Sequence, residues 1–120
     1  MRKNTVVVGL LVLLALADMA YAQEITWQEI ARGISEINTV LVQPDNPRII
    51  YLGAKNGIFK SENAGETWRN ILSVRGSNGE VNFLAFALGN RDYLYAATGN
   101  GLFYSSNQGG HWQRIFKGRN

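Results

Sequence analysis

A nine-residue stretch occurs twice in this chain, as KSENAGETW at residues 60–68 and as YSSNQGGHW at residues 104–112. The match extends upstream, because IYLGAKNGIFKSENAGETW from Ile50 aligns with LYAATGNGLFYSSNQGGHW from Leu94 at a constant spacing of 44 residues. A weaker echo, TWQEI from Thr26, lies 41 residues before TWRNI. Repeats of about 40 to 45 residues indicate arrays of similar units, with four-stranded propeller blades as the leading case. The matched pairs are Tyr51/Tyr95, Asn56/Asn100, Gly57/Gly101, Phe59/Phe103, Ser61/Ser105, Asn63/Asn107, Gly65/Gly109 and Trp68/Trp112.

Each unit contains four short segments typical of strands. The first segments, TVLVQP and VNFLAFAL, are rich in β-forming residues and are followed by the turn sequences DNPR and GNRD. The second, IIYLGA and YLYAAT, run into Asn-Gly, a strong hairpin signal. The third are IFKS and LFYS, and the fourth begin at the tryptophans of TWRNIL and HWQRIF. We therefore predict an all-β fold with two four-stranded antiparallel propeller blades, at residues 37–73 and 81–117, and an extra N-terminal strand at 23–31.

The repeated loop joins the third and fourth strands, and its residue types can be explained by turn chemistry. Ser61 and Asn63 can bond backbone amides across the turn, and Gly65 can supply a positive φ. Trp68 is expected to pack under the loop. A turn is needed in every blade whereas a catalytic site is normally made once, so the repetition favours a structural role. The structural set is Ser61, Asn63, Gly65, Thr67, Trp68, Ser105, Asn107, Gly109 and Trp112.

The spacing Ser-x-Asn-x-Gly-x-Thr-Trp resembles the Asp-box, or bacterial neuraminidase (BNR) repeat, whose pattern is Ser/Thr-x-Asp-x-Gly-x-Thr-Trp. Both copies carry Asn at the Asp position, and the second carries His111 in place of Thr. The resemblance covers residues 25–117 and implies a propeller of the sialidase-like superfamily. Families with such boxes include sialidases, xyloglucan-active glycoside hydrolases, sortilin-type receptors and the photosystem II stability and assembly factors. The last look most similar in style, but the box occurs in enzymes and non-enzymes alike.

The N-terminus has the organisation of a secretory signal peptide. Arg2 and Lys3 precede an apolar run from Val6 to Ala17, and Ala20-Tyr21-Ala22 forms a small-x-small cleavage pattern. The apolar run is shorter than the roughly 20 residues of a transmembrane helix. We expect cleavage after Ala22, no transmembrane anchor in the processed protein, and a secreted or periplasmic location.

Charge and cysteine content limit the function classes. Without residues 1–22 the chain has 10 Lys and Arg against 8 Asp and Glu, and the basic residues are scattered, which argues against nucleic acid as a partner. Cysteine is absent, so disulfides cannot support the small core. His111 is the only histidine, which leaves neither a metal cluster nor a Ser-His pair, and we expect no metal and no cofactor.

No set of catalytic residues stands out. A sialidase-like site would need an arginine cluster and a Tyr-Glu pair, and NPRII lacks the proline of the Arg-Ile-Pro signature. Other glycoside hydrolases need two carboxyl groups about 5 to 10 Å apart, whereas the acidic residues here fall mostly in loops or outer strands. We assign no catalytic residue and lean against an enzyme.

Propellers close with about four to eight blades, so two predicted blades need completion. One interpretation is a homo-oligomer, and the other is a fragment of a longer propeller. We expect an exported, non-catalytic binding or assembly module with a protein or carbohydrate partner. The alternatives are a fragment or oligomer-completed form of a sialidase-like glycoside hydrolase, and a truncated reading frame without independent function. Loops that differ between the repeats are the candidate binding positions, namely Glu62, Glu66, Arg75 and Asn78.

Overall fold

The computed structural model describes residues 31, 33–76 and 78–117. The predicted signal peptide and residues 23–30 of the predicted N-terminal strand lie outside the described residues. The chain divides into two units, Met1–Gly33 and Ile34–Asn120, and both sheets belong to the second unit. The described residues contain two four-stranded antiparallel sheets and no helix, as the repeat predicts. They include no helix long and apolar enough to cross a membrane.

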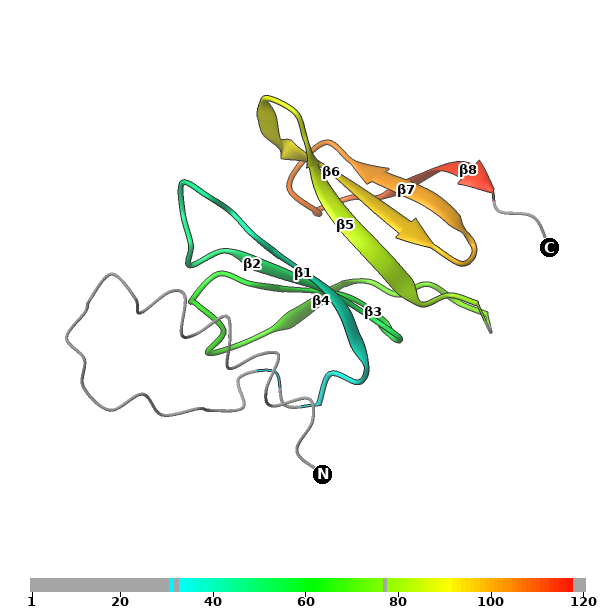
Figure 1. The fold of residues 1–120 in the computed structure, drawn as a ribbon, viewed down its shortest axis with the longest axis horizontal. Helices are drawn as coiled ribbons and strands as arrows, with labels where there is room; N and C mark the ends of the chain where they lie inside the picture. The colour runs from blue at the N-terminus through cyan, green and yellow to red at the C-terminus, as the bar shows by residue number, and fades with distance from the viewer. Residues whose placement is uncertain (1–30, 32, 77, 118–120) are drawn as a thin grey trace. The chain divides into compact units, whose positions relative to one another are not determined.

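The first sheet has the strand order β1-β2-β3-β4, so each strand pairs with its neighbour in sequence (Figure 1). Every pairing is antiparallel. The sheet ends one residue before the predicted blade boundary at residue 73. Its strands are β1 (Ile37–Val42), β2 (Ile50–Ala54), β3 (Gly57–Ser61) and β4 (Arg69–Leu72).

The second sheet repeats the same meander in the order β5-β6-β7-β8. Its outer limits, residues 81 and 117, coincide with the range expected for the second blade. The strands are β5 (Val81–Ala87), β6 (Asn90–Thr98), β7 (Gly101–Ser105) and β8 (Gln113–Lys117).

Two local expectations were wrong. The fourth strands begin one residue after the tryptophans, at Arg69 and Gln113, because cross-strand pairing starts at Lys60–Arg69 and Tyr104–Gln113. The turn between β5 and β6 is formed by Leu88 and Gly89 rather than by GNRD, since Asn90 already pairs with Ala87. Gly89 has a φ of 80°, a conformation that favours glycine.

The Asn-Gly sequences lie at the hairpins, but the two turn residues are one position earlier than the Asn-Gly pair. Lys55 and Asn56 form the β2–β3 turn, and the positive φ falls on Gly57, which is the first residue of β3 (φ 131°). Gly101 has the same place and a φ of 132° in the second sheet. The paired Asn-Gly sequences therefore identify the hairpins correctly, but only the glycine takes the positive φ.

One face of the first sheet packs against one face of the second. Tyr51 and Ile58 from the first sheet and Val81, Leu84 and Leu94 from the second form a buried cluster. Tyr51, Ile58, Val81 and Leu94 are each fully buried. Burying an apolar side chain of this size stabilises a fold by about 1.5–3 kcal/mol, so this cluster is the main apolar contribution that joins the two sheets.

Gly53 permits the close approach of β5 to β2. A Cβ atom at Gly53 would lie 2.5 Å from Cγ2 of Thr39 and 2.6 Å from Cγ1 of Val81. Both distances are shorter than real Cβ contacts, and both neighbours are stiff β-branched side chains. The absence of a side chain at residue 53 is therefore a packing requirement of the contact between the sheets.

Candidate functional site

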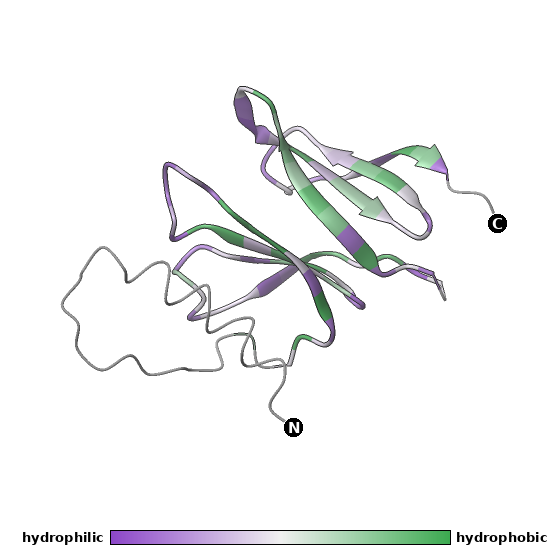
Figure 2. Ribbon diagram, viewed as in Figure 1, coloured by the Kyte–Doolittle hydropathy of each residue, from purple (hydrophilic) through white to green (hydrophobic). Residues whose placement is uncertain are grey.

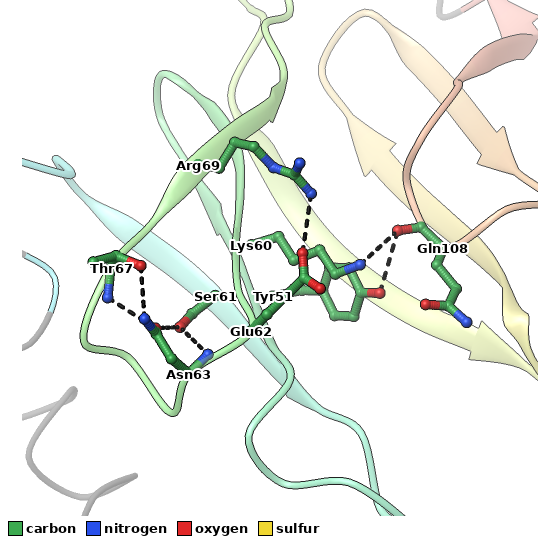
Figure 3. A network of polar contacts seen from close by, with 8 residues as sticks. All are labelled: Tyr51, Lys60, Ser61, Glu62, Asn63, Thr67, Arg69 and Gln108. Atoms are coloured by element: carbon green, nitrogen blue, oxygen red, sulfur yellow. Dashed lines mark hydrogen bonds and ion pairs between the residues drawn. The ribbon is translucent and has the colours of Figure 1, made fainter.

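The loop at residues 62–68, between β3 and β4, is held by the side chains of Ser61 and Asn63. The hydroxyl oxygen of Ser61 accepts hydrogen bonds from the backbone amides of Asn63 (3.3 Å) and Gly65 (2.8 Å). The same hydroxyl donates to Oδ1 of Asn63 at 2.9 Å. Oδ1 of Asn63 also accepts a bond from the amide of Thr67 at 2.9 Å, and Nδ2 donates to the Thr67 hydroxyl at 2.8 Å (Figure 3). The two side chains thus replace the backbone partners that a loop lacks.

The loop at residues 106–112, between β7 and β8, repeats this network. The Ser105 hydroxyl oxygen accepts from the amides of Asn107 (3.3 Å) and Gly109 (2.9 Å) and donates to Oδ1 of Asn107 (3.0 Å). Oδ1 of Asn107 accepts the backbone amide of His111 at 2.9 Å. His111 thus takes the place of Thr67 through its main chain, so this bond does not depend on the side chain. The carbonyl oxygen of Asn fills the acceptor role that a carboxylate oxygen would fill.

Both loops contain two consecutive residues with positive φ. Ala64 and Gly65 have φ values of 60° and 91°, and Gln108 and Gly109 have 60° and 86°. A Cβ atom at Gly109 would lie 2.6 Å from Cδ1 of Ile71, a residue of the first sheet. Glycine at residue 109 therefore serves both the turn and the contact with the neighbouring sheet. Trp112 is half-buried and packs against the core cluster, and Trp68 is also half-buried.

The second loop is joined to the first sheet by Tyr51, Lys60 and Gln108, which we call the seam. The Tyr51 hydroxyl donates to the backbone carbonyl oxygen of Gln108 at 3.3 Å, and Nζ of Lys60 donates to the same oxygen at 3.4 Å (Figure 3). Nζ of Lys60 also lies 5.4 Å from the centre of the Tyr51 ring, within the range of a cation–π contact. One carbonyl of the second loop thus has two donors from β2 and β3.

Burial at the seam moves the pKa values of both donors in the direction that favours the neutral form of each group. Burial, with smaller effects from the Glu62 and Asp92 carboxylates, raises the pKa of Tyr51 to about 12. Burial and the nearby Arg69 lower the pKa of Lys60, and Glu62 acts in the opposite direction. Desolvation disfavours the charged form of each group. A tyrosine with a raised pKa is a stable hydrogen-bond donor rather than a proton acceptor.

Gln108 is fixed by Asp92, which lies in β6. The backbone amide of Gln108 donates to the backbone carbonyl of Asp92 at 2.8 Å, and Nε2 of Gln108 donates to Oδ1 of Asp92 at 2.7 Å. The first loop has the equivalent backbone bond, from Ala64 to Arg48, at 2.9 Å. The loop that contacts the first sheet is therefore held rigidly by its own sheet.

The four candidate binding residues fall into two separate groups. Glu62 and Glu66 lie in the loop after β3, and Glu62 forms an exposed ion pair with Arg69 at 3.2 Å. Arg75 and Asn78 lie in the connection that follows β4, and the Arg75 carbonyl accepts a bond from Asn100 in the β6–β7 turn. Because β4 ends beside Ile58, near the hairpin end of β3, these groups lie at opposite ends of the first sheet. The four residues therefore do not form one continuous surface.

Five of the six described carboxylates contact a separate hydrogen-bond donor or basic side chain. Three of them form surface ion pairs at 3.2–3.7 Å, in the pairs Glu36–Lys55, Glu62–Arg69 and Asp45–Arg91. Glu80 accepts from Asn38, and Asp92 accepts from Gln108. Within the described part of the chain, no group of three or more His, Cys, Asp or Glu residues is arranged to hold a metal ion.

Sequence reasoning did not identify the seam. Tyr51 and Tyr95 are matched in the repeat, but Lys60 corresponds to Tyr104 and Gln108 corresponds to Ala64. The acceptor is a backbone carbonyl, which leaves no side-chain signature. The available signal was the apolar run of β2 with a tyrosine directly opposite a lysine, Tyr51 beside Lys60.

Comparison with known proteins gives matches at the level of structure. No family model matches the sequence. No curated protein matches it either. An ancestral GH74 enzyme superposes with a TM-score of 0.67 and 22% identity, over 78% of this chain and 14% of that enzyme. The GH74 xyloglucanase from Xanthomonas campestris gives a TM-score of 0.50 and 20% identity, over 63% of this chain and 14% of the enzyme. YCF48 from Cyanidioschyzon merolae gives a TM-score of 0.56 and 18% identity, over 72% of this chain and 26% of YCF48.

These similarities establish the fold alone. The GH74 and YCF48 neighbours support a propeller arrangement for the two sheets. This chain spans between 14% and 26% of the length of these three proteins. The two four-stranded sheets of this chain are thus similar to a segment of a larger propeller.

Proposed function

We propose that this chain is an exported, non-catalytic binding and assembly module of the Asp-box propeller type. The observation that carries the proposal is the use of the polar side chains. Ser61, Asn63, Ser105 and Asn107 hold the loops, and the seam residues hold the second loop to the first sheet. What is left for a partner is the exposed surface of the second sheet, where Phe83 and Phe116 are 59% and 65% exposed.

Exposed aromatic side chains on a sheet favour a protein partner. A contiguous patch of exposed apolar side chains often marks an interaction surface. The resemblance to the photosystem II assembly factors is compatible with such a role, and the predicted signal peptide would deliver the module to the periplasm or the exterior. A carbohydrate partner is the second choice, because tyrosine rings also stack on sugars.

The alternative is a fragment of a glycoside hydrolase propeller. It is supported by the structural similarity to two GH74 enzymes, which superpose with TM-scores of 0.67 and 0.50. A glycoside hydrolase needs two carboxyl groups placed across a cleft at about 5–10 Å. The carboxylates of Glu36, Asp45 and Glu62 instead form ion pairs with basic residues on the surface.

An assay of hydrolysis separates the two functions. The full chain, expressed with its N-terminal segment so that a bacterial host can process it, is incubated with xyloglucan and reducing ends are measured. We expect no release above that of a buffer blank. As a control for contaminating hydrolase, a Glu62→Gln, Asp92→Asn double variant is prepared in parallel. Release by the unsubstituted chain that the double variant lacks would reject the non-catalytic proposal.

A further inference from the structure

The second sheet has one face that no strand of the described chain covers, which we call the apolar outer face. The strand register places its residues in two rows across β5, β6, β7 and β8. One row is Phe83, Ala97, Leu102 and Phe116, and the other contains Tyr95 and Tyr104. Figure 2 shows the apolar residues along β5, β6 and β7 in green.

The apolar outer face corresponds, 44 residues later, to the face of the first sheet that is buried at the core. There the rows are Thr39, Gly53, Ile58 and Leu72, and Leu41, Tyr51, Lys60 and Arg69. Tyr51 and Ile58 have no exposed surface because the second sheet covers them. The fold therefore uses this face for sheet-to-sheet packing, and on the second sheet the same face is exposed at Phe83 and Phe116.

The two faces differ in charge, and the difference indicates the partner. Lys60 and Arg69 of the first sheet correspond to Tyr104 and Gln113 of the second, so both cations are replaced by neutral side chains. A surface without charge can meet a copy of itself without like-charge repulsion, whereas two copies of a face carrying Lys and Arg could not. Tyrosine and phenylalanine are also the side chains enriched at the cores of protein interfaces.

The aromatic residues of this face are already arranged as a packed group. The rings of Tyr95 and Tyr104 lie 5.3 Å apart, and Tyr93 lies edge-on to Tyr104 at 5.8 Å. Rings that pack on one another lose less freedom on binding than isolated side chains, which lowers the cost of association. The face is therefore organised before any partner arrives.

An interface that uses the same patch on both subunits needs only one exposed face and closes with twofold symmetry. We propose that the apolar outer face binds a second copy of this chain, so that the two second sheets pack against each other in a symmetric dimer. This inference rests on the proposed assembly function and names its partner.

The test is the solution mass of the full chain by size-exclusion chromatography with light scattering. We expect a discrete dimer. Phe83→Glu places a carboxylate on the apolar outer face of both copies and is expected to raise the dissociation constant by roughly a hundredfold. Leu88→Glu is the matched control, because Leu88 is fully exposed in the β5–β6 turn and does not belong to this face. It is expected to remain dimeric.

Tyr104→Lys tests the charge argument directly. The first sheet carries a lysine at the corresponding place, so the fold accepts this residue type. The variant is expected to dissociate, and to recover part of its affinity at high salt because salt screens the repulsion. Far-ultraviolet circular dichroism confirms that each variant keeps its sheets.

Several results would overturn the proposal. A monomeric full chain, a trimer or larger ring, a heterogeneous aggregate, or a Phe83→Glu variant that dimerises as strongly as Leu88→Glu would each do so. A ring would indicate that another blade covers the face instead. The proposed function can fail independently of the dimer. A dimer that hydrolyses xyloglucan would reject the non-catalytic role but would retain the proposed interface. A monomer without hydrolase activity would reject the interface but would retain the non-catalytic role, with a different partner.

Discussion

The hydroxyl group of Tyr51 lies 3.3 Å from the backbone carbonyl oxygen of Gln108, and this hydrogen bond crosses from the first sheet to the loop of the second. The donor lies in the centre of the first sheet and the acceptor lies 57 residues later in the chain. The bond therefore reports on the packing of the two sheets and not on the stability of either one alone.

Removing the donor should weaken the whole unit. Tyr51→Phe keeps the ring in the core and deletes one hydrogen bond, which leaves only Lys60 on the Gln108 carbonyl, so we expect a loss of about 1 kcal/mol in the free energy of unfolding. Urea unfolding followed by circular dichroism measures this loss. Tyr95→Phe is the matched control, because Tyr95 occupies the equivalent place on the apolar outer face. An equal loss in both variants, at a concentration where the chain is monomeric, would contradict the role of the seam.

The raised pKa of Tyr51 predicts a pH dependence above pH 10. The folded-state pKa is about 12 and the ordinary value is 10.0, so the folded protein holds this proton more tightly. The stabilisation is fully present below pH 10 and is lost as the pH rises from 10 to 12, since the unfolded chain then binds fewer protons than the folded one. At pH 11 the loss should be on the order of 1 kcal/mol.

Tyr51→Phe isolates this effect, because phenylalanine does not ionise. The decrease in unfolding free energy between pH 9 and pH 11 should be smaller in Tyr51→Phe than in the unsubstituted chain. Other tyrosines and lysines contribute equally to both proteins, so they cancel in the comparison. Identical pH profiles would show that the Tyr51 hydroxyl is not buried at the seam.

The first loop should tolerate Asp but not Ala at residue 63. Asn63→Ala removes the acceptor for the Thr67 amide and the partner of Ser61, and is expected to destabilise the fold by about 1–3 kcal/mol. Asn63→Asp keeps an oxygen at the Oδ1 position, and the Thr67 hydroxyl can donate to the second carboxylate oxygen, so the change should be within about 0.5 kcal/mol. Thermal unfolding of the two variants in parallel makes the comparison. A loss as large for Asp as for Ala would mean that the amide group of Asn63 is essential.

Substitution of Gly53 tests the close packing of β2 and β5. Gly53→Ala adds a Cβ atom 2.5 Å from Thr39 and 2.6 Å from Val81, so one strand must move, and we expect a loss of about 1–3 kcal/mol. The reverse change at the matched position, Ala97→Gly, adds no atom and is expected to cost about 0.5–1 kcal/mol through backbone entropy. Urea midpoints measure both. A neutral Gly53→Ala would show that the sheets lie further apart than described.

Much of the fold could be predicted from the repeat. The spacing of 44 residues and the strand-forming segments indicate two four-stranded antiparallel sheets, because each repeat encodes its own turns locally. The roles of Ser61 and Asn63 also follow from residue type, since a hydroxyl and an amide oxygen near a glycine are suited to bond loop amides. Local chemistry of this kind is written in neighbouring residues and can be read without knowledge of the tertiary structure.

The seam and the apolar outer face could not be predicted in the same way. The acceptor at Gln108 is a main-chain carbonyl, which every residue has, and its position depends on how β5 packs on β2. The difference between Lys60 and Tyr104 is visible in the sequence, but it gains meaning only when the register shows that both belong to the same face. Similarly, Glu62 and Arg75 are only 13 residues apart in the sequence, but β4 lies between them, so they are at opposite ends of the first sheet.

We expect the seam to join the two sheets into one cooperative unit, and amide hydrogen exchange of the full chain tests this most directly. The amides of β2 and β6 should exchange with the same free energy of opening, because neither sheet unfolds alone. Tyr51→Phe should lower both free energies by the same amount. Different opening free energies for the two sheets, with Tyr51→Phe affecting the first sheet only, would contradict the account.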